Sequence, residues 1–157
     1  MNWRKLSGEP ITQEIKAAVE EAILRERAAG YRLKVCVGTD SQVHTDCIEF
    51  ATVILFLREK KGGFMFIHNE RVVNRVMSLR ERMITEVGKS VDVAYNLCAL
   101  LDKHHVELEV HADVNTDPHF KSNVAFRDAM GYIMGMGFVF KAKPDAIAAS
   151  CCADKVL

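Results

Sequence analysis

The sequence is organised around Leu33-Lys34-Val35-Cys36-Val37-Gly38-Thr39-Asp40, an apolar run that ends in an acidic residue. A short apolar run bounded by turn-forming residues is typical of a strand buried in the middle of a sheet. A carboxylate that is buried there without a partner costs several kcal/mol, but the same group is useful as a metal ligand. The run therefore predicts a central strand with a functional residue, Asp40, at its exit.

Further strands are predicted on both sides of this run. Residues 47–57 and 64–72 are rich in β-branched and aromatic residues, and Gly62-Gly63 marks a turn between them. The three segments together predict an antiparallel meander. Residues 106–113 alternate apolar and polar side chains and predict a fourth strand, which ends at Asp113. Residues 138–141 predict a short fifth strand.

Helical spacing of apolar residues predicts the remaining elements. A leading helix has a stripe of small and branched apolar residues, with Pro10 near its start and Gly30 at its end. A long helix spans residues 79–103. Ser78 comes directly before this helix and Glu81 lies in its first turn, and together they form a capping-box pattern. A third helix follows the loop at residues 117–118 and runs through Ile133. A closing helix covers residues 146–153.

Length and composition favour one globular domain. The chain has 157 residues, of which 49% are hydrophobic and 27% charged, as in ordinary water-soluble proteins. Apolar runs stay short of the roughly 18 to 20 residues of a membrane-spanning helix, and residues 1–14 lack a signal-peptide pattern. We expect a cytoplasmic location. With 21 basic and 21 acidic residues the net charge is zero, so any surface for nucleic acid must be local.

The five cysteines favour reduced, buried thiols over a disulfide framework. A structural zinc site built from Cys151, Cys152, His104 and His105 is the competing interpretation. Adjacent cysteines point in different directions on a helix, and the chain has no paired C-x2-C elements. The spacing therefore disfavours zinc.

Four acidic residues are the candidate catalytic and metal-ligating set: Asp40, Glu86, Asp113 and Asp154. Two lie at predicted strand ends and two on predicted helices. Simpler roles are also open, because Asp40 with Ser41, and Asp113, can cap turns, and Glu86 can be a surface residue of its helix. Asp145 is an alternative acid near the closing helix, although its place after Pro144 suits a helix N-terminus.

Several motifs in the chain resemble the YkuK family, a bacterial group regarded as ribonuclease H-like nucleases. The motifs are Val37-Gly38-Thr39-Asp40-Ser41-Gln42, His111-Ala112-Asp113-Val114-Asn115, residues 131–137, and Lys143-Pro144-Asp145 through Asp154. The resemblance implies an α/β, ribonuclease H-like domain over residues 1–157. Its core would be residues 33–157, with a mixed five-stranded sheet of three antiparallel and two parallel strands flanked by helices. Residues 1–32 would form an N-terminal helical extension.

The resemblance also implies a metal-dependent site. The first and fourth strands would be neighbours, so Asp40 and Asp113 would lie side by side, with Glu86 and Asp154 approaching from helices. Such a set would bind two Mg²⁺ or Mn²⁺ ions about 4 Å apart, as in two-metal phosphodiester hydrolysis. Supporting or phosphate-contacting roles fall to Ser41, Gln42, Asn115 and Ser150. His111 and His119 are candidates for proton transfer, although a structural histidine is the commoner case.

One segment is basic enough to contact nucleic acid. Between residues 71 and 90 the candidates are Arg71, Arg75, Arg80, Arg82 and Lys89. A solvated helix face explains the same charges equally well. The resulting hypotheses are a divalent-metal-dependent nuclease, a catalytically inactive nucleic-acid-binding or regulatory module of the same fold, and a nucleotide-using enzyme of the actin-like class. The last needs glycine-rich phosphate turns, which the sequence lacks.

Overall fold

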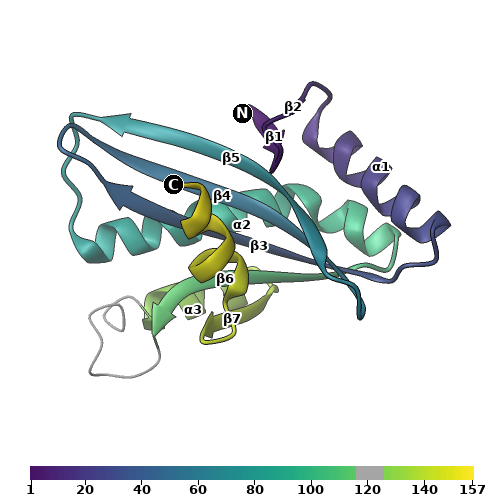
Figure 1. Ribbon diagram of the computed structural model, residues 1–157. Coiled ribbons are helices and arrows are strands. Elements are labelled where there is room, and N and C mark those ends of the chain that lie inside the picture. The colour runs from purple at the N-terminus through teal and green to yellow at the C-terminus, as the bar shows by residue number, and fades with distance from the viewer. Residues whose placement is uncertain (116–125) are drawn as a thin grey trace.

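The computed structural model describes residues 1–115 and 126–157 and is built on one mixed sheet (Figure 1). The central strand β3 (Leu33–Val43) pairs antiparallel with β4 (Cys47–Arg58), which pairs antiparallel with β5 (Gly63–Val73). On its other side β3 pairs in parallel with β6 (Glu107–Asn115), which pairs in parallel with β7 (Val139–Lys143). The predicted meander and the predicted adjacency of the first and fourth strands are confirmed.

The predicted number of strands is wrong, because the sheet has seven strands in the order β2-β1-β5-β4-β3-β6-β7. The additional strands are β1 (Trp3–Lys5) and β2 (Pro10–Ile11), and β1 extends the sheet by pairing with β5. Residues 1–32 are therefore not a purely helical extension, and Pro10 lies in a strand. Segments of two or three residues are too short to show a period, so their structure depends on the β5 edge beside them.

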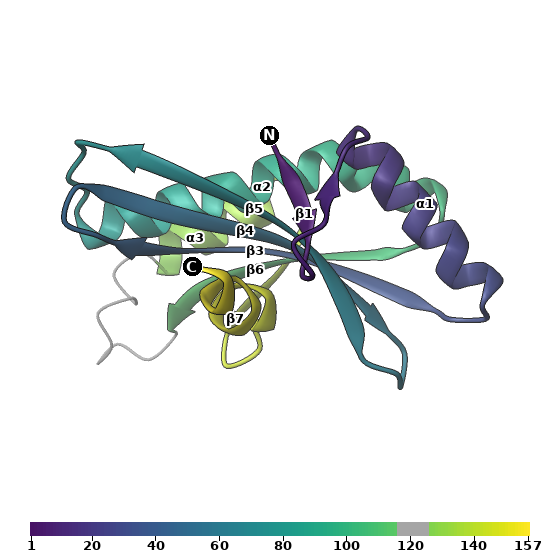
Figure 2. The ribbon, with the colours of Figure 1, turned by 45° about the horizontal axis from the view of Figure 1, so that its top comes forward.

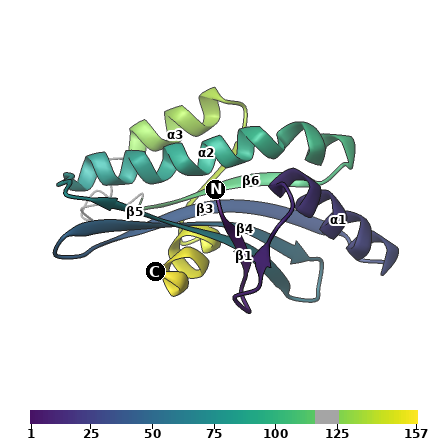
Figure 3. The same cartoon turned by 90° about the horizontal axis from the view of Figure 1, so that it is seen from above.

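Helices cover the two faces of the sheet unequally (Figure 3). On one face lie α1 (Ile15–Ala28), α2 (Leu79–Lys103) and α3 (Phe126–Gly135). The main core lies between them and the sheet, where α1 buries the predicted side chains Ala18, Val19, Ala22 and Ile23. Within residues 1–115 and 126–157, no helix is both long and apolar enough for a membrane span.

The N-terminus of α2 matches the predicted pattern in part. The hydroxyl oxygen of Ser78 accepts a hydrogen bond from the backbone N–H of Glu81 at 3.1 Å, which satisfies one of the free donors of the first turn. The Glu81 carboxylate accepts a hydrogen bond from Arg75 at 2.9 Å. The Ser78 half of the predicted capping box is confirmed, and the partner that the structure gives the Glu81 carboxylate is Arg75.

Two predicted strand ends lie further along the chain than expected. β3 continues to Val43 because it remains paired with β4, in which Ala51 lies opposite Asp40. The pairing of β3 with β6 is the part that ends near Asp40, because the last paired residues of these two strands are Thr39 and Ala112. β6 likewise continues to Asn115. Asp40 and Asp113 are therefore near the end of the β3–β6 ladder, inside their strands.

The C-terminal segment covers the opposite face of the sheet and crosses β3, β4 and β6 (Figure 2). It consists of the π-helix η2 (Ala148–Ala153) and the 3-10 helix η3 (Asp154–Val156), where an α-helix was predicted. The segment packs very close to β3. A Cβ atom added to Gly38 would lie 2.4 Å from the backbone nitrogen of Ala149 and 2.6 Å from the carbonyl carbon of Ala148. Only glycine allows this approach.

The variant Gly38→Ala should therefore displace η2 and lower the free energy of unfolding by about 1 to 3 kcal/mol, as overpacking does in well-packed cores. Urea unfolding followed by circular dichroism measures the change. Gly88→Ala is the matched control, because no atom lies within 4 Å of its added Cβ and alanine favours the helix interior. Equal stability of Gly38→Ala and the wild type would contradict the close packing.

Candidate metal centre

Asp40 and Asp113 lie on adjacent parallel strands at the same level. Each directly follows one member of the registered pair Thr39 and Ala112. Burial, together with the nearby charges of Asp113 and Asp154, raises the pKa of Asp40 to about 6, although a hydrogen bond from the Ser41 backbone N–H opposes the rise. The sheet thus places carboxylates of like charge within electrostatic reach of one another.

The strand that carries Asp113 is irregular at this point. Between the pairs His111 with Lys141 and Asn115 with Lys143, β6 has more residues than β7, which is the mark of a β-bulge. Bulges change the direction of side chains and are common next to active sites. The Nζ atom of Lys143 lies 2.8 Å from Oδ1 of Asp113, an ion pair at the end of β7.

Glu86 reaches the same region from α2. It is only 3% exposed, and burial raises its pKa to about 8, with further contributions from the charges of Asp40 and Asp113. The hydroxyl of Ser41 donates a hydrogen bond to Oε1 of Glu86, which opposes the rise, as does the charge of Arg82. A glutamate this deeply buried is not the surface residue that the simpler interpretation proposed.

A buried set of hydroxyl groups holds α2 against the sheet below Glu86. The Thr39 hydroxyl lies 2.9 Å from that of Thr52 and 2.8 Å from that of Ser90, and all three residues are buried. Ser90 is one helical turn after Glu86. These hydrogen bonds set the position of α2 over β3, and with it the position of the Glu86 carboxylate.

Asp154 approaches from the other face of the sheet, at the start of η3. It is exposed, yet its side chain is close enough to raise the pKa of Asp40. Two hydrogen bonds hold its segment: the Ala148 N–H donates to Nδ1 of His111 at 3.1 Å, and the Asn69 side chain donates to the Val156 carbonyl at 2.9 Å. Asp154 is therefore anchored on both sides despite its place near the end of the chain.

The four carboxylates converge without forming a tight cluster. Among the described residues, one group of three potential ligands has all its ligand atoms within 4.8 Å of one another, and it is Cys36, Glu109 and His111. Any three of the four predicted carboxylates are more widely spaced.

The Cys36, Glu109 and His111 group is better explained as a hydrogen-bond network than as a metal site. Because Nδ1 of His111 accepts the Ala148 N–H, the ring proton is on Nε2, 3.0 Å from Oε1 of Glu109. Burial lowers the pKa of His111, and burial with the Glu109 charge raises that of Cys36 to about 12. A metal ion at this point would need an unprotonated Nε2 of His111 and a thiolate of Cys36. The network keeps a proton on Nε2 and favours the thiol form of Cys36.

The predicted supporting residues differ in their surroundings. Ser41 bonds Glu86, as described above, whereas Gln42 is exposed on β3. Asn115 ends β6, and its backbone pairs with Lys143. The Ser150 hydroxyl donates to the Ala146 carbonyl at 2.7 Å, just before the start of η2. His111 is the buried structural histidine described above, and His119 lies outside the described residues.

Most of the predicted basic contacts are engaged with acidic side chains. Arg71 lies 3.7 Å from Glu49, and Arg75 lies 2.9 Å from Glu81. Lys89 lies 2.5 Å from Glu70 and also faces the ring of Phe50. Arg82 is half-buried, Arg80 is exposed, and a role of this segment in binding nucleic acid stays a prediction.

The cysteines are all free, and the zinc alternative is not assembled among the described residues. His104 lies 3.2 Å from Glu20 at the end of α2, and Cys151 is exposed on η2. Only Cys36 is buried, so the expectation of uniformly buried thiols is wrong. The exposed and half-buried cysteines lie on surfaces of strands and helices that neighbouring elements leave open.

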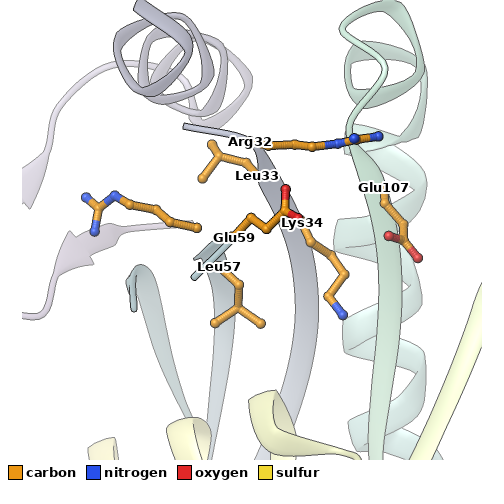
Figure 4. Close-up of a pocket in the computed structure, with 7 residues that line it drawn as sticks. Arg32, Leu33, Lys34, Leu57, Glu59 and Glu107 are labelled. Atoms are coloured by element: carbon orange, nitrogen blue, oxygen red, sulfur yellow. The ribbon is translucent and has the colours of Figure 1, made fainter. Parts of the chain in front are cut away.

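A cavity of about 430 Å³ opens at the opposite end of β3 from Asp40 (Figure 4). Basic and acidic side chains line it together, among them Arg32, Lys34, Glu59 and Glu107. Lys34 and Glu107 extend from paired positions of β3 and β6. This mixture of charges gives no preference for an anion or a cation, so the carboxylates remain the best candidate site.

Comparison with known proteins agrees with this architecture. The family model described as ribonuclease H-like matches residues 14–157, and the chain belongs to that family. It is similar to the uncharacterized protein YkuK of Bacillus subtilis (strain 168), with 27% identity over 153 residues, which cover 87% of this chain and 85% of YkuK. No solved structure matches.

Sequence reasoning missed two residues of the site. Lys143 falls beyond the predicted end of the fifth strand, because β7 runs two residues further than residues 138–141. Gly38 was part of a motif without an assigned reason. The available signals were the position of Gly38 two residues before Asp40 on the same strand and that of Lys143 at the end of the strand beside β6.

The raised pKa of Glu86 predicts a pH dependence of stability in metal-free buffer. The raised pKa keeps the Glu86 proton on the folded protein up to about pH 8, whereas the unfolded chain releases it near the ordinary glutamate pKa of 4.5. The folded state binds more protons between these values, so the free energy of unfolding falls as pH rises. Glu86→Gln cannot ionise and should exceed the wild type at pH 8 by on the order of a few kcal/mol.

Urea unfolding with EDTA between pH 4.5 and 8.5 measures this difference. Asp92→Asn, an exposed change on the same helix, is the matched control and should follow the wild type closely. Parallel pH profiles for Glu86→Gln and the wild type would show that Glu86 ionises normally.

Proposed function

We propose that this protein is a divalent-metal-dependent nuclease that hydrolyses phosphodiester bonds of nucleic acid. The observation that carries the proposal is the electrostatic convergence of four carboxylates from β3, α2, β6 and η3. Membership of the ribonuclease H-like family indicates a role connected with nucleic acid. Family alone does not select a chemistry, so the proposal rests on the carboxylates.

The donor set fits a hard divalent cation. Asp40, Glu86, Asp113 and Asp154 offer oxygen ligands alone, which Mg²⁺ and Mn²⁺ prefer. Oδ1 of Asp113 is buried and lacks a hydrogen bond of regular geometry among the described residues, although the Lys143 ammonium is near. Buried carboxylates with raised pKa values gain from a cation that favours their ionised form.

The four carboxylates and Ser41 would have different roles in holding a metal ion. Asp40 and Asp113, on strands, would hold the ion most rigidly, and Glu86 would complete the ligand set from α2. Asp154 would close the site from the opposite face. Ser41 orients the Glu86 carboxylate through its hydrogen bond. A bound ion supplies activation of a water molecule and stabilisation of the leaving oxygen. The sequence-based expectation is a pair of ions.

The substitutions Asp40→Asn and Asp113→Asn should each lower divalent-dependent cleavage by roughly two orders of magnitude or more, because each removes a charged ligand. Cleavage of single-stranded and double-stranded DNA, RNA and an RNA–DNA hybrid, with Mg²⁺ or Mn²⁺, measures the effect. Asp92→Asn, an exposed acid on α2, is the matched control. Unchanged cleavage and Mn²⁺ affinity in Asp40→Asn would refute the proposal.

The alternative function, a non-catalytic nucleic-acid-binding module, predicts a different pattern. Reversing Arg75, Arg80 and Arg82 to glutamate would then abolish binding, and Asp40→Asn would have no effect on any function of the protein. Under the proposed function the same reversal weakens binding and makes its loss with salt less steep, because fewer phosphates are neutralised, while Asp40→Asn still binds but does not cleave. Fluorescence anisotropy with a labelled oligonucleotide, beside the cleavage assay, separates the two.

A further inference from the structure

The acid cluster contains a basic residue for which the proposed function has no role. Lys143 is the last residue of β7, and its backbone pairs with Asn115 just after the bulge that holds Asp113. Its position is therefore set by the sheet and not by a loose loop. Its side chain is 39% exposed, whereas that of Asp113 is 16% exposed. The ammonium group thus reaches inward from the rim of the site.

The contacts of Lys143 are with the predicted metal ligands. Nζ lies 2.8 Å from Oδ1 of Asp113, and the charges of Asp40 and Asp154 also act on the ammonium group. The Asp113 oxygen that it contacts is buried. A buried carboxylate oxygen needs a cationic or hydrogen-bonding partner, and Lys143 supplies the charge.

An ammonium group and a divalent ion compete for such a position. A Mg²⁺ or Mn²⁺ ion held by Oδ1 of Asp113 would lie next to the oxygen that Lys143 already contacts. The Lys143 ammonium occupies the same side of the carboxylate, and two cations this close together repel strongly in a partly buried site. The other carboxylates, Asp40, Glu86 and Asp154, have no lysine at ion-pair distance among the described residues.

We infer that Lys143 is a built-in cation of this site, which takes the place of one of the two divalent ions. The protein then binds one divalent ion, held chiefly by Asp40 with the help of Glu86 and Asp154, and Lys143 supplies positive charge at Asp113. This inference rests on the proposed function and revises its expectation of two ions. Lys143 supplies positive charge to the Asp113 carboxylate. Replacing Lys143 by a neutral residue frees this carboxylate to bind a second divalent ion.

The test is the number of Mn²⁺ ions bound per chain, measured by isothermal titration calorimetry and by electron paramagnetic resonance of the bound Mn²⁺. The full chain is used as the wild type and as Lys143→Met and Lys143→Arg, with Lys141→Met on the same strand as the matched control. Circular dichroism checks that each variant is folded, and the wild-type stoichiometry is informative without any variant.

We expect one Mn²⁺ in the wild type, Lys141→Met and Lys143→Arg, and two in Lys143→Met, with the spectral broadening of a coupled ion pair. Two ions in the wild type, or one ion in a folded Lys143→Met, would overturn the inference. Two ions together with cleavage by the wild type would leave the proposed nuclease intact. No ion in the wild type would overturn the inference and would remove the nuclease proposal with it.

Discussion

The parallel ladder between β3 and β6 is the constraint on which the site is built. Its register brings Thr39 level with Ala112, so the next residues, Asp40 and Asp113, meet at one end of the sheet although they are far apart in sequence. Backbone hydrogen bonds hold this register, and a slip of β6 by one residue would turn Asp113 to the opposite face, away from Asp40. The other groups of the site are then positioned against this pair.

Both faces of the sheet contribute to the site, and each does so through close packing. On one face the hydroxyl groups of Thr39, Thr52 and Ser90 set the height of α2 and thereby bury Glu86. On the other face Gly38 lets η2 contact β3 directly, and His111 holds Ala148. The carboxylates therefore have unequal surroundings, which is why the pKa of Glu86 is raised further than that of Asp40.

Local sequence patterns predicted most of the elements correctly. The bounds of α2 agree with residues 79–103, because a long amphipathic helix repeats its signal many times and has a cap at Ser78. The same reasoning failed for β1 and β2, which are stabilised by pairing with each other and with β5. It also failed for the closing helix, which has π and 3-10 geometry and packs directly against β3.

The order of strands and helices and the identity of four acidic candidates could be read from the amino-acid sequence, because hydrophobic periodicity and the cost of burying charge are local properties. The residues that surround each of these acids could not be read from the sequence. Glu86 is buried and bonded to Ser41, and Asp113 is paired with Lys143, because the chain folds distant segments together. Charge pairing and pKa depend on distances through space, and those distances exist only once the sheet and its helices are assembled.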